Sequence, residues 1–374
     1  MKRICVLCAV IFILLIVNGC WDQDLLKNAR LLYGEGIDLA PNGKLRSTFV
    51  IRDMPPGEQQ SPKNDIIYTV GNTLMETREH ADEQVSRHLV TYRNRIILIG
   101  EELAKQDIYP ILETFYRDPK SALNARIGVT KGTAANILSL KKVGNVLIGE
   151  EIDELIKSRE ETTTVPKVTL ENIYSVMLDP GEDFVLPYLI EEGGRVKVAR
   201  IALFHDNKLT GQLSPDESTM YLLLKDRREK LARFTRKINA AHEGRQNRYN
   251  FLTFSVDKLK RKMTVQAQSD DRITVKLDLN MKLSVIEYPK DHLDKEKVLA
   301  ELNQYLSKEM TDLAKETLRK IQEARCDGLG IGRELRAFHP DIWKKQKDEW
   351  GSNYQKVDFI PAIQVQITKK GVLN

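Results

Sequence analysis

The residue types that usually carry catalysis or bind metals are present in this sequence, but their spacing matches no familiar site. Gly328, Gly330 and Gly332 have the spacing of a phosphate-binding loop, yet they follow a predicted helix and no Lys-Ser or Lys-Thr pair comes after them. The histidines lie at positions 80, 88, 205, 242, 292 and 339, and no two are three to five residues apart. Neither a GxSxG elbow nor an HExxH motif occurs. We therefore predict no catalytic, cofactor or metal site.

The remaining candidates also have simpler interpretations. Glu150-Glu151 and Asp270-Asp271 are adjacent acids whose side chains point in different directions, which favours solvated surfaces over a glycosidase pair. The three glycines are better interpreted as a flexible exit from the preceding helix, because glycine commonly ends helices. Cys326, beside them, is interpreted as a packing residue.

Cys20 is the residue whose setting predicts covalent chemistry. Lys2 and Arg3 precede an uncharged apolar run of 14 residues, Ile4–Val17, which suits a signal peptide and is too short to span a bilayer as a helix. The run ends in Val17-Asn18-Gly19-Cys20, which is similar to a lipobox, where the cysteine thiol takes a diacylglyceryl group and becomes the first mature residue. Two acyl chains suffice for stable anchoring. The alternatives are an uncleaved anchor, or an ordinary signal in which Cys20 is incidental.

Composition limits the kind of body that follows this segment. The chain has 374 residues, of which 41% are hydrophobic and 30% charged, as in a folded protein. This composition excludes a polytopic membrane protein and wholesale disorder. The net charge is +5, and it falls to +3 when Lys2 and Arg3 leave with the signal. So thin an excess does not indicate a nucleic-acid partner.

Strands and helices alternate in the N-terminal half. Two apolar runs around the Pro41-Asn42-Gly43 turn predict a β-hairpin over 32–52. Further strands are predicted at 95–100 and 125–130, and helices at 71–89, 101–108, 110–118, 134–140, 147–158 and 168–177. Residues 54–65 and the region of Pro180-Gly181 and Pro187 are predicted to be loops.

The C-terminal half has clearer periodicity. Apolar residues alternate from Ile273 to Val285, which predicts a long half-buried strand, and helical spacing over 294–326 predicts one long helix. Strands are also predicted at 196–204, 209–213, 249–256, 263–267 and 363–367, with a helix starting at Ser214. The basic stretches Lys225–Lys230 and Lys258–Lys262 could touch anionic lipid headgroups or be solvated linkers, and we favour linkers.

These elements predict an α+β, multi-domain protein with mixed β-sheets, packed helices and one long C-terminal helix. The predicted units are a signal peptide at 1–19, an N-terminal α/β domain at 20–195 and a C-terminal α+β region at 196–374. Whether the last region divides again near 245 is left open.

The ordered motifs resemble the Ger(x)C family, the C subunits of GerA-type spore germinant receptors. Cys20-Trp21-Asp22-Gln23 is close to the "CWD" start of that family. The resemblance continues through Gly34–Asp38, Ile97–Ala104, Phe115–Pro119, Ala202–Phe204, Lys208–Gly211, Gly328–Gly332 and Phe338–Lys344. The order and spacing match along nearly the whole mature chain.

The resemblance implies properties that composition does not reveal. It implies three α+β domains, and as partners two polytopic membrane subunits, A and B. It implies a place on the extracytoplasmic side of the spore inner membrane, held to lipid through Cys20, and a part in the response to nutrients. No catalytic residue carries over. We interpret the polar loop around Arg117 and Asp118 as a partner contact, and the alternative is a turn that ends a helix.

Two other functions compete with a non-enzymatic receptor subunit. An envelope solute-binding lipoprotein would capture the nutrient directly, but such proteins have two similar lobes and the two halves here differ. An envelope enzyme such as a cortex hydrolase would need an acid pair or nucleophile. We therefore expect a subunit that is not an enzyme.

Overall fold

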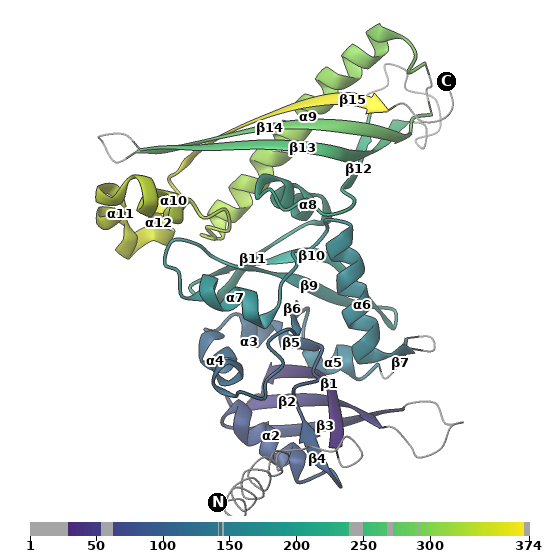
Figure 1. The fold of residues 1–374 in the computed structure, drawn as a ribbon, viewed down its shortest axis with the longest axis vertical. Coiled ribbons are helices and arrows are strands. Elements are labelled where there is room, and N and C mark those ends of the chain that lie inside the picture. The colour runs from purple at the N-terminus through teal and green to yellow at the C-terminus, as the bar shows by residue number, and fades with distance from the viewer. Residues whose placement is uncertain are drawn as a thin grey trace, which may run out of the picture.

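The computed structural model describes residues 29–53, 63–140, 142–143, 146–238, 250–267, 272–289 and 292–369. They form an elongated molecule in which two sheets follow one another along the long axis (Figure 1). A nine-stranded mixed sheet occupies the N-terminal end and the middle, and a four-stranded sheet occupies the C-terminal end. Cys20 and the predicted signal peptide lie outside the described residues.

The first sheet has the strand order β11-β10-β9-β6-β5-β1-β2-β3, and β4 pairs with β1. Its strands are β1 (Ala29–Leu39), β2 (Leu45–Asp53), β3 (Lys63–Gly71), β4 (His88–Val90), β5 (Ile96–Gly100), β6 (Arg126–Thr130), β9 (Val185–Glu192), β10 (Arg195–His205) and β11 (Lys208–Leu213). The central strands β1, β5, β6 and β9 pair in parallel, and the hairpins at both ends are antiparallel. All five residues of β5 are buried, as expected of a parallel strand covered on both faces.

Helices cover both faces of this sheet. They are α2 (Leu74–Asp82), α3 (Glu101–Ala104), α4 (Tyr109–Arg117), α5 (Ala134–Leu138), α6 (Ile148–Glu161) and α7 (Leu170–Met177), and a short hairpin, β7 (Lys142–Val143) and β8 (Val146–Leu147), precedes α6. Ile97 and Ile99 pack with α3, α4 and α7 on one face. Ile96 and Leu98 pack with α5 and α6 on the other. The alternation along β5 thus creates two separate cores in a three-layer arrangement.

The second sheet has the order β12-β13-β14-β15 and one helix along it. Its elements are β12 (Arg233–Lys237), β13 (Phe251–Ala267), β14 (Ile273–Glu287), β15 (Asp358–Lys369) and α9 (Glu296–Glu323). The predicted alternation is observed, because every second residue of β14 from Ile273 to Val285 is buried and packs in one core with the apolar side of α9. Four shorter helices and a 3₁₀ turn connect the parts: α8 (Pro215–Leu224), α10 (Ile331–Phe338), α11 (Pro340–Gln346), η3 (Lys347–Glu349) and α12 (Trp350–Tyr354).

Side chains of α9 close the outer edge of β15. Asn303, Ser307 and Thr311 accept the backbone N–H groups of residues 367, 365 and 363, at 2.8, 3.0 and 3.1 Å. Residues four apart on a helix advance about 6 Å, and residues two apart on a strand advance about 6.6 Å, so the two rows stay in register. The edge strand is thereby protected from pairing with another strand.

The predicted fold class is confirmed: the chain is α+β, with mixed sheets and one long C-terminal helix. The division predicted at 195 falls in the hairpin between β9 and β10, inside the first sheet, and remains a prediction about domain organisation. Position 245 lies outside the described residues.

Several local predictions were wrong. Strand β3 extends from Lys63 to Gly71, although we predicted a loop as far as residue 65 and no strand between that loop and the next helix. The helix predicted over 71–89 is shorter and ends at Asp82. Strand β9 includes Pro187, which was assigned to a loop. Pro187 lies next to the point where pairing of β9 with β6 begins, at Tyr188, so its missing N–H leaves that short ladder intact.

The linker interpretation was wrong for one of the two basic stretches. Lys225–Lys230 lies in the connection between the end of α8 and the start of β12, as a linker would, but Lys258–Lys262 lies inside β13. The two strands predicted at 249–256 and 263–267 are one strand of 17 residues, and a bulge between Val256 and Lys258 joins its two parts.

Candidate functional site

An acidic segment between α7 and β9 joins the two halves of the molecule. Its carboxylates, Asp179, Glu182 and Asp183, are called the acidic clasp below. Arg336 donates to both oxygens of Asp179, at 3.1 and 3.0 Å, and Arg333 pairs with Glu182 at 2.5 Å. The clasp therefore ties the end of α7 to α10, which lies more than 150 residues later in the chain.

The clasp also holds α8 and the turn after α9. Lys225, at the end of α8, donates to Glu182 at 2.6 Å and also to the carbonyl of Gly328. Asp183 accepts the backbone N–H of Asp327 at 2.8 Å. The pKa of Glu182 is lowered: burial raises it, but Lys225 and Arg333 together outweigh burial.

Asp327 is the most buried charged group at this junction. Its carboxylate accepts the N–H groups of Gly330, Ile331 and Gly332 at 3.0, 2.8 and 2.7 Å, and the indole N–H of Trp350 at 2.9 Å. These bonds satisfy the free N–H groups at the start of α10, where a negative charge also favours the helix dipole. Burial raises the pKa of Asp327 to about 7, although its N–H donors oppose that shift.

The glycine-rich segment is a close-packed contact, which corrects its interpretation as a flexible helix exit. Gly330 has φ of +78°, a conformation that favours glycine. A Cβ on Gly332 would lie 2.7 Å from the Cα of Gly181 and 2.9 Å from atoms of Trp343 and Trp350. The backbones of α10 and the clasp thus touch directly, and the N–H of Arg333 donates to the carbonyl of Gly181 at 3.0 Å.

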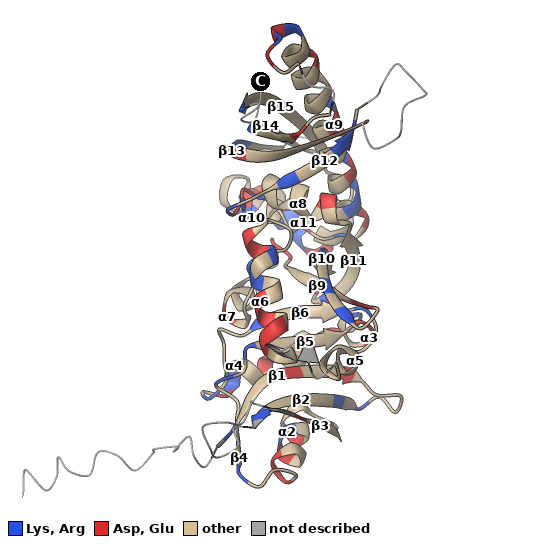
Figure 2. Ribbon diagram, turned by 90° about the vertical axis from the view of Figure 1, so that its right-hand side faces the viewer, with Lys and Arg blue, Asp and Glu red and all other residues tan. Residues whose placement is uncertain are grey.

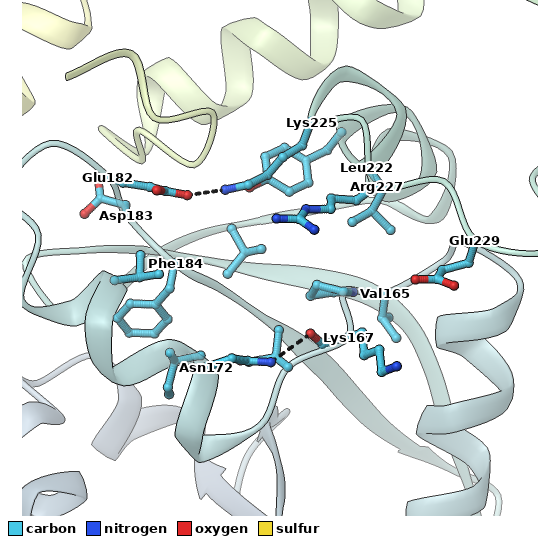
Figure 3. A pocket seen from close by; sticks show the side chains of 16 residues that line it. Val165, Lys167, Asn172, Glu182, Asp183, Phe184, Leu222, Lys225, Arg227 and Glu229 are labelled. Carbon is cyan, nitrogen blue, oxygen red and sulfur yellow. Dashed lines mark hydrogen bonds and ion pairs between the residues drawn. The ribbon is translucent and has the colours of Figure 1, made fainter. Parts of the chain in front are cut away.

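A cavity of about 400 Å³ lies beside the clasp, between α7 and α8 (Figure 3). Its apolar lining includes Phe184 and Leu222, and the side chain of Arg227 extends into it (Figure 3). Lys167 and Glu229 lie on the rim, and no histidine, cysteine or serine lines the cavity. This lining can bind a small amphipathic group.

A second hollow, of about 560 Å³, lies on the other side of the same segment, next to α12. His205 lines it and contacts Asp183 at 3.2 Å. Burial lowers the pKa of His205, but the hydrogen bond to Asp183 and the charge of that residue outweigh burial, so the pKa is raised overall. The clasp is therefore flanked by two concave surfaces, and it contacts two groups, Asp327 and His205, whose pKa values are raised.

Cys326 lies directly before Asp327 and is fully buried in the core of the second sheet. Burial raises its pKa well above the usual range, so its thiol stays protonated and unreactive. This agrees with its interpretation as a packing residue.

The predicted contact residues Arg117 and Asp118 belong to a different network at the end of α4. Arg117 is exposed and pairs with Glu113 on the same helix, at 2.5 Å. Asp118 accepts the N–H of Lys120 at 2.9 Å and lies 3.6 Å from the buried guanidinium of Arg78. Asp118 thus has a structural role, and a partner contact at either residue remains a prediction.

Arg78 itself connects this turn to the first sheet. It pairs with the fully buried Glu35 at 3.0 Å and lies over the ring of Phe115 at 4.5 Å. A buried ion pair of this kind is costly to break, because the remaining charge has no partner.

Within the described ranges, no helix is long and apolar enough to cross a membrane. The same residues contain no cluster of three or more His, Cys, Asp or Glu side chains that could hold a metal ion.

The acidic clasp and the cavity were not predicted from the sequence. Asp179-Pro180-Gly181 has the composition of an ordinary turn, and its partners lie more than 100 residues away. Asp327 carried a local signal, because it stands shortly before α10 with glycines between them, as a helix-capping acid would.

Comparison with known proteins covers nearly the whole chain. Residues 22–191 match the family described as spore germination protein N-terminal domain. Residues 199–371 match the family described as spore germination B3/GerAC like, C-terminal. These matches confirm the resemblance inferred from the ordered motifs.

Individual relatives are similar over their full length. The spore germination protein GerQC of Bacillus cereus is 25% identical, over 97% of this chain and 98% of its own. Spore germination proteins B3 and KC of Bacillus subtilis (strain 168) are 23% and 22% identical, over 97% and 95% of this chain and 97% and 92% of their own. The crystal structure of the GerBC protein superimposes with a TM-score of 0.60 at 19% identity, over 93% of this chain and all of that one, and so shows the same fold.

Proposed function

The chain belongs to the GerAC-like family of spore germination proteins, and on that basis we propose that it is the lipid-anchored, non-enzymatic C subunit of a spore nutrient germinant receptor. In this proposal it acts with two polytopic membrane subunits, A and B. It is held on the extracytoplasmic side of the spore inner membrane.

The observation that carries the proposal is the family match together with the position of Cys20. The match begins at residue 22, two residues after the proposed lipidated cysteine, and continues to residue 371. Strand β1 begins at Ala29, so an extended tether from Cys20 reaches about 30 Å. A lipid on Cys20 would therefore hold the folded body close to the membrane.

The acidic clasp suggests how such a subunit would act. Contacts on one sheet can be transmitted to the other only if the junction between them is rigid. Asp327 with its four N–H donors, and the direct contact of Gly181 with Gly332, provide that rigidity. We infer that the body docks as one unit on the A and B subunits and biases their response to nutrient, which requires different contacts in the resting and activated states.

The cavity beside the clasp supports one competing function, direct capture of the nutrient. Its volume is in the range of small-molecule sites, and Arg227 could face an anionic group. Isothermal titration of the purified body with single amino acids and sugars tests this. Tight binding in the absence of A and B would favour a solute-binding lipoprotein, and no binding would support the receptor subunit.

The proposal itself is tested with a Cys20→Ala variant in spores, followed by membrane fractionation and a nutrient germination assay. We expect the variant to leave the membrane fraction and germination to fall. Cys8→Ala is the matched control, because it removes a cysteine of the predicted signal and leaves the lipidation position intact. A Cys20→Ala chain that stays membrane-bound and supports normal germination would contradict the lipid anchor.

A further inference from the structure

One face of the second sheet is not covered by any helix or strand among the described residues. Helix α9 packs against the face of the sheet that carries Leu277, Leu279 and Met281. Figure 2 shows α9 on one side of β13, β14 and β15. Five lysines of β13 and β14 belong to the uncovered side, called the lysine face below: Lys258, Lys260, Lys262, Lys276 and Lys282. All five are solvent-exposed.

The charges on this face are only partly balanced by neighbours, with Lys262 directly opposite Asp278. Lys258 stands directly opposite Lys282 in the antiparallel ladder, an arrangement of like charges that destabilises a sheet. Two aspartates, Asp278 and Asp358, lie on the same face, and neither forms an ion pair with a described residue. Five lysines against two aspartates leave an excess of three positive charges.

The other acid nearby is already neutralised. Asp257, at the bulge of β13, pairs with Lys369 at 3.2 Å and accepts the hydroxyl of Ser284. The lysine face therefore keeps an excess of positive charge, and an external anion would offset the repulsion between Lys258 and Lys282.

The composition of the face distinguishes between classes of anionic partner. A hollow of about 630 Å³ on it is lined by Lys258, Lys260, Lys282 and the amides Asn280, Gln364 and Gln366, with Met281 and Val365 completing the lining. Protein interfaces are enriched in aromatic residues and arginine and depleted in lysine, so this face is unlike a protein-binding surface. Lysine is a compact, strongly hydrated charge that suits a diffuse negative surface.

The edge of the sheet adds a second argument. Side chains of α9 cap β15 along residues 363–367, so a partner strand cannot extend the sheet on that side. With that edge capped, the routes to the second sheet are its open face and the opposite edge, formed by β12 and β13.

We propose that the lysine face rests on the anionic headgroups of a lipid bilayer. The proposal rests on the proposed function only for placing the chain at a membrane. The lysine face and β1, which follows Cys20 in the chain, lie toward opposite ends of the molecule (Figure 1). Contact at both ends would hold the long axis along the membrane, where a lipid tether alone would leave the orientation free.

The test uses the mature chain, residues 20–374, with Cys20→Ser so that no lipid is attached. Binding is measured by flotation with vesicles of 70% phosphatidylcholine and 30% phosphatidylglycerol. We expect binding at about 50 mM NaCl that is lost at about 500 mM NaCl, and none to pure phosphatidylcholine. The variant K258Q/K260Q/K282Q should reduce the partition coefficient about a hundredfold, from a tenfold change per 1.4 kcal/mol and about 1 kcal/mol per lysine.

The matched control is K44Q/K131Q/K208Q, which removes the same charge from exposed lysines of the first sheet and its loops. It should retain binding within about threefold of the parent chain. Neither triple variant should be less stable than the parent chain, because all six side chains are exposed, and K258Q/K260Q/K282Q also removes the like-charge pair.

Four outcomes would overturn the proposal. The control variant could lose as much binding as the lysine-face variant, which would mean that only net charge matters. The chain could fail to bind the anionic vesicles. Millimolar inorganic phosphate at constant ionic strength could abolish binding, which would indicate a site for free phosphate. Poly-glutamate could bind more tightly than vesicles of equal charge, which would indicate an acidic protein. Each result leaves the Cys20→Ala test of the proposed function unaffected.

Discussion

Substituting Gly332 by alanine tests whether the junction between the sheets is a close-packed contact. The added methyl group would lie 2.7 Å from the Cα of Gly181, 2.9 Å from Trp343 and 2.9 Å from the indole nitrogen of Trp350. All three neighbours are backbone or ring atoms held in the core, so the methyl group can be accommodated only if α10 moves away from the clasp.

The expected magnitude follows from two opposing effects. Overpacking of a tight contact costs about 1–3 kcal/mol. Replacing glycine by alanine within a helix recovers up to about 1 kcal/mol. We therefore expect Gly332→Ala to lower the free energy of unfolding by about 1–2 kcal/mol and to change the tryptophan fluorescence, because Trp343 and Trp350 both border the added group.

The assay is urea unfolding followed by circular dichroism and tryptophan fluorescence. Ala337→Ser, on the exposed side of α10, is the control and should stay within about 0.5 kcal/mol of the parent chain. Gly181→Ala should destabilise the same contact, so the double variant should lose less than the sum of the two single losses. A Gly332→Ala chain with unchanged stability and unchanged fluorescence would refute the close-packed junction.

Three further predictions concern charged groups. The pKa of Asp327 is raised from 3.8 to about 7 and that of His205 is raised from 6.5, so the folded state holds protons that the unfolded state releases, and stability should fall as pH rises from about 5 to 8. Asp327→Asn and His205→Gln should each flatten this dependence in thermal unfolding, and a steeper fall in either variant would contradict the assignment. Arg78→Ala should cost about 3–5 kcal/mol in urea unfolding because it leaves the buried carboxylate of Glu35 without a charged partner and with only the amide of Asn94, at 3.4 Å, whereas a loss below about 1 kcal/mol would show that water replaces the guanidinium. Arg117→Glu should lower the free energy of unfolding by about 1 kcal/mol or less, because it replaces an exposed ion pair with Glu113 by a like-charge pair, and it should reduce recovery of the receptor complex and germination; normal values of both would remove Arg117 as a contact.

Elements with one strong period were predictable from the sequence. Strand β14 alternates without interruption, and α9 carries an apolar stripe over 28 residues, so each pattern allowed one interpretation. In β3 the signal is mixed, because Ile67 is buried while its neighbour Tyr68 and nearby Val70 are apolar and exposed. In β13 the lysines at every second position have the composition of a linker, although they mark one exposed face of a strand.

The candidate site could not be predicted, because its parts are distant in the sequence. Asp183 and Asp327 are 144 positions apart, and each has the local appearance of a loop acid. Their meeting depends on how α8 and α10 pack between the two sheets, which no local pattern encodes. Cys20 is the opposite case, since the prediction of its lipidation rests only on the twenty residues that precede and include it.

The most direct test of the central proposal is affinity purification of the chain from detergent-solubilised spore membranes, followed by mass spectrometry of all recovered proteins. The account predicts that two polytopic membrane subunits are recovered with it, and that its first residue is Cys20 carrying a diacylglyceryl group. Recovery of the chain alone, with an unmodified N-terminus, would contradict it.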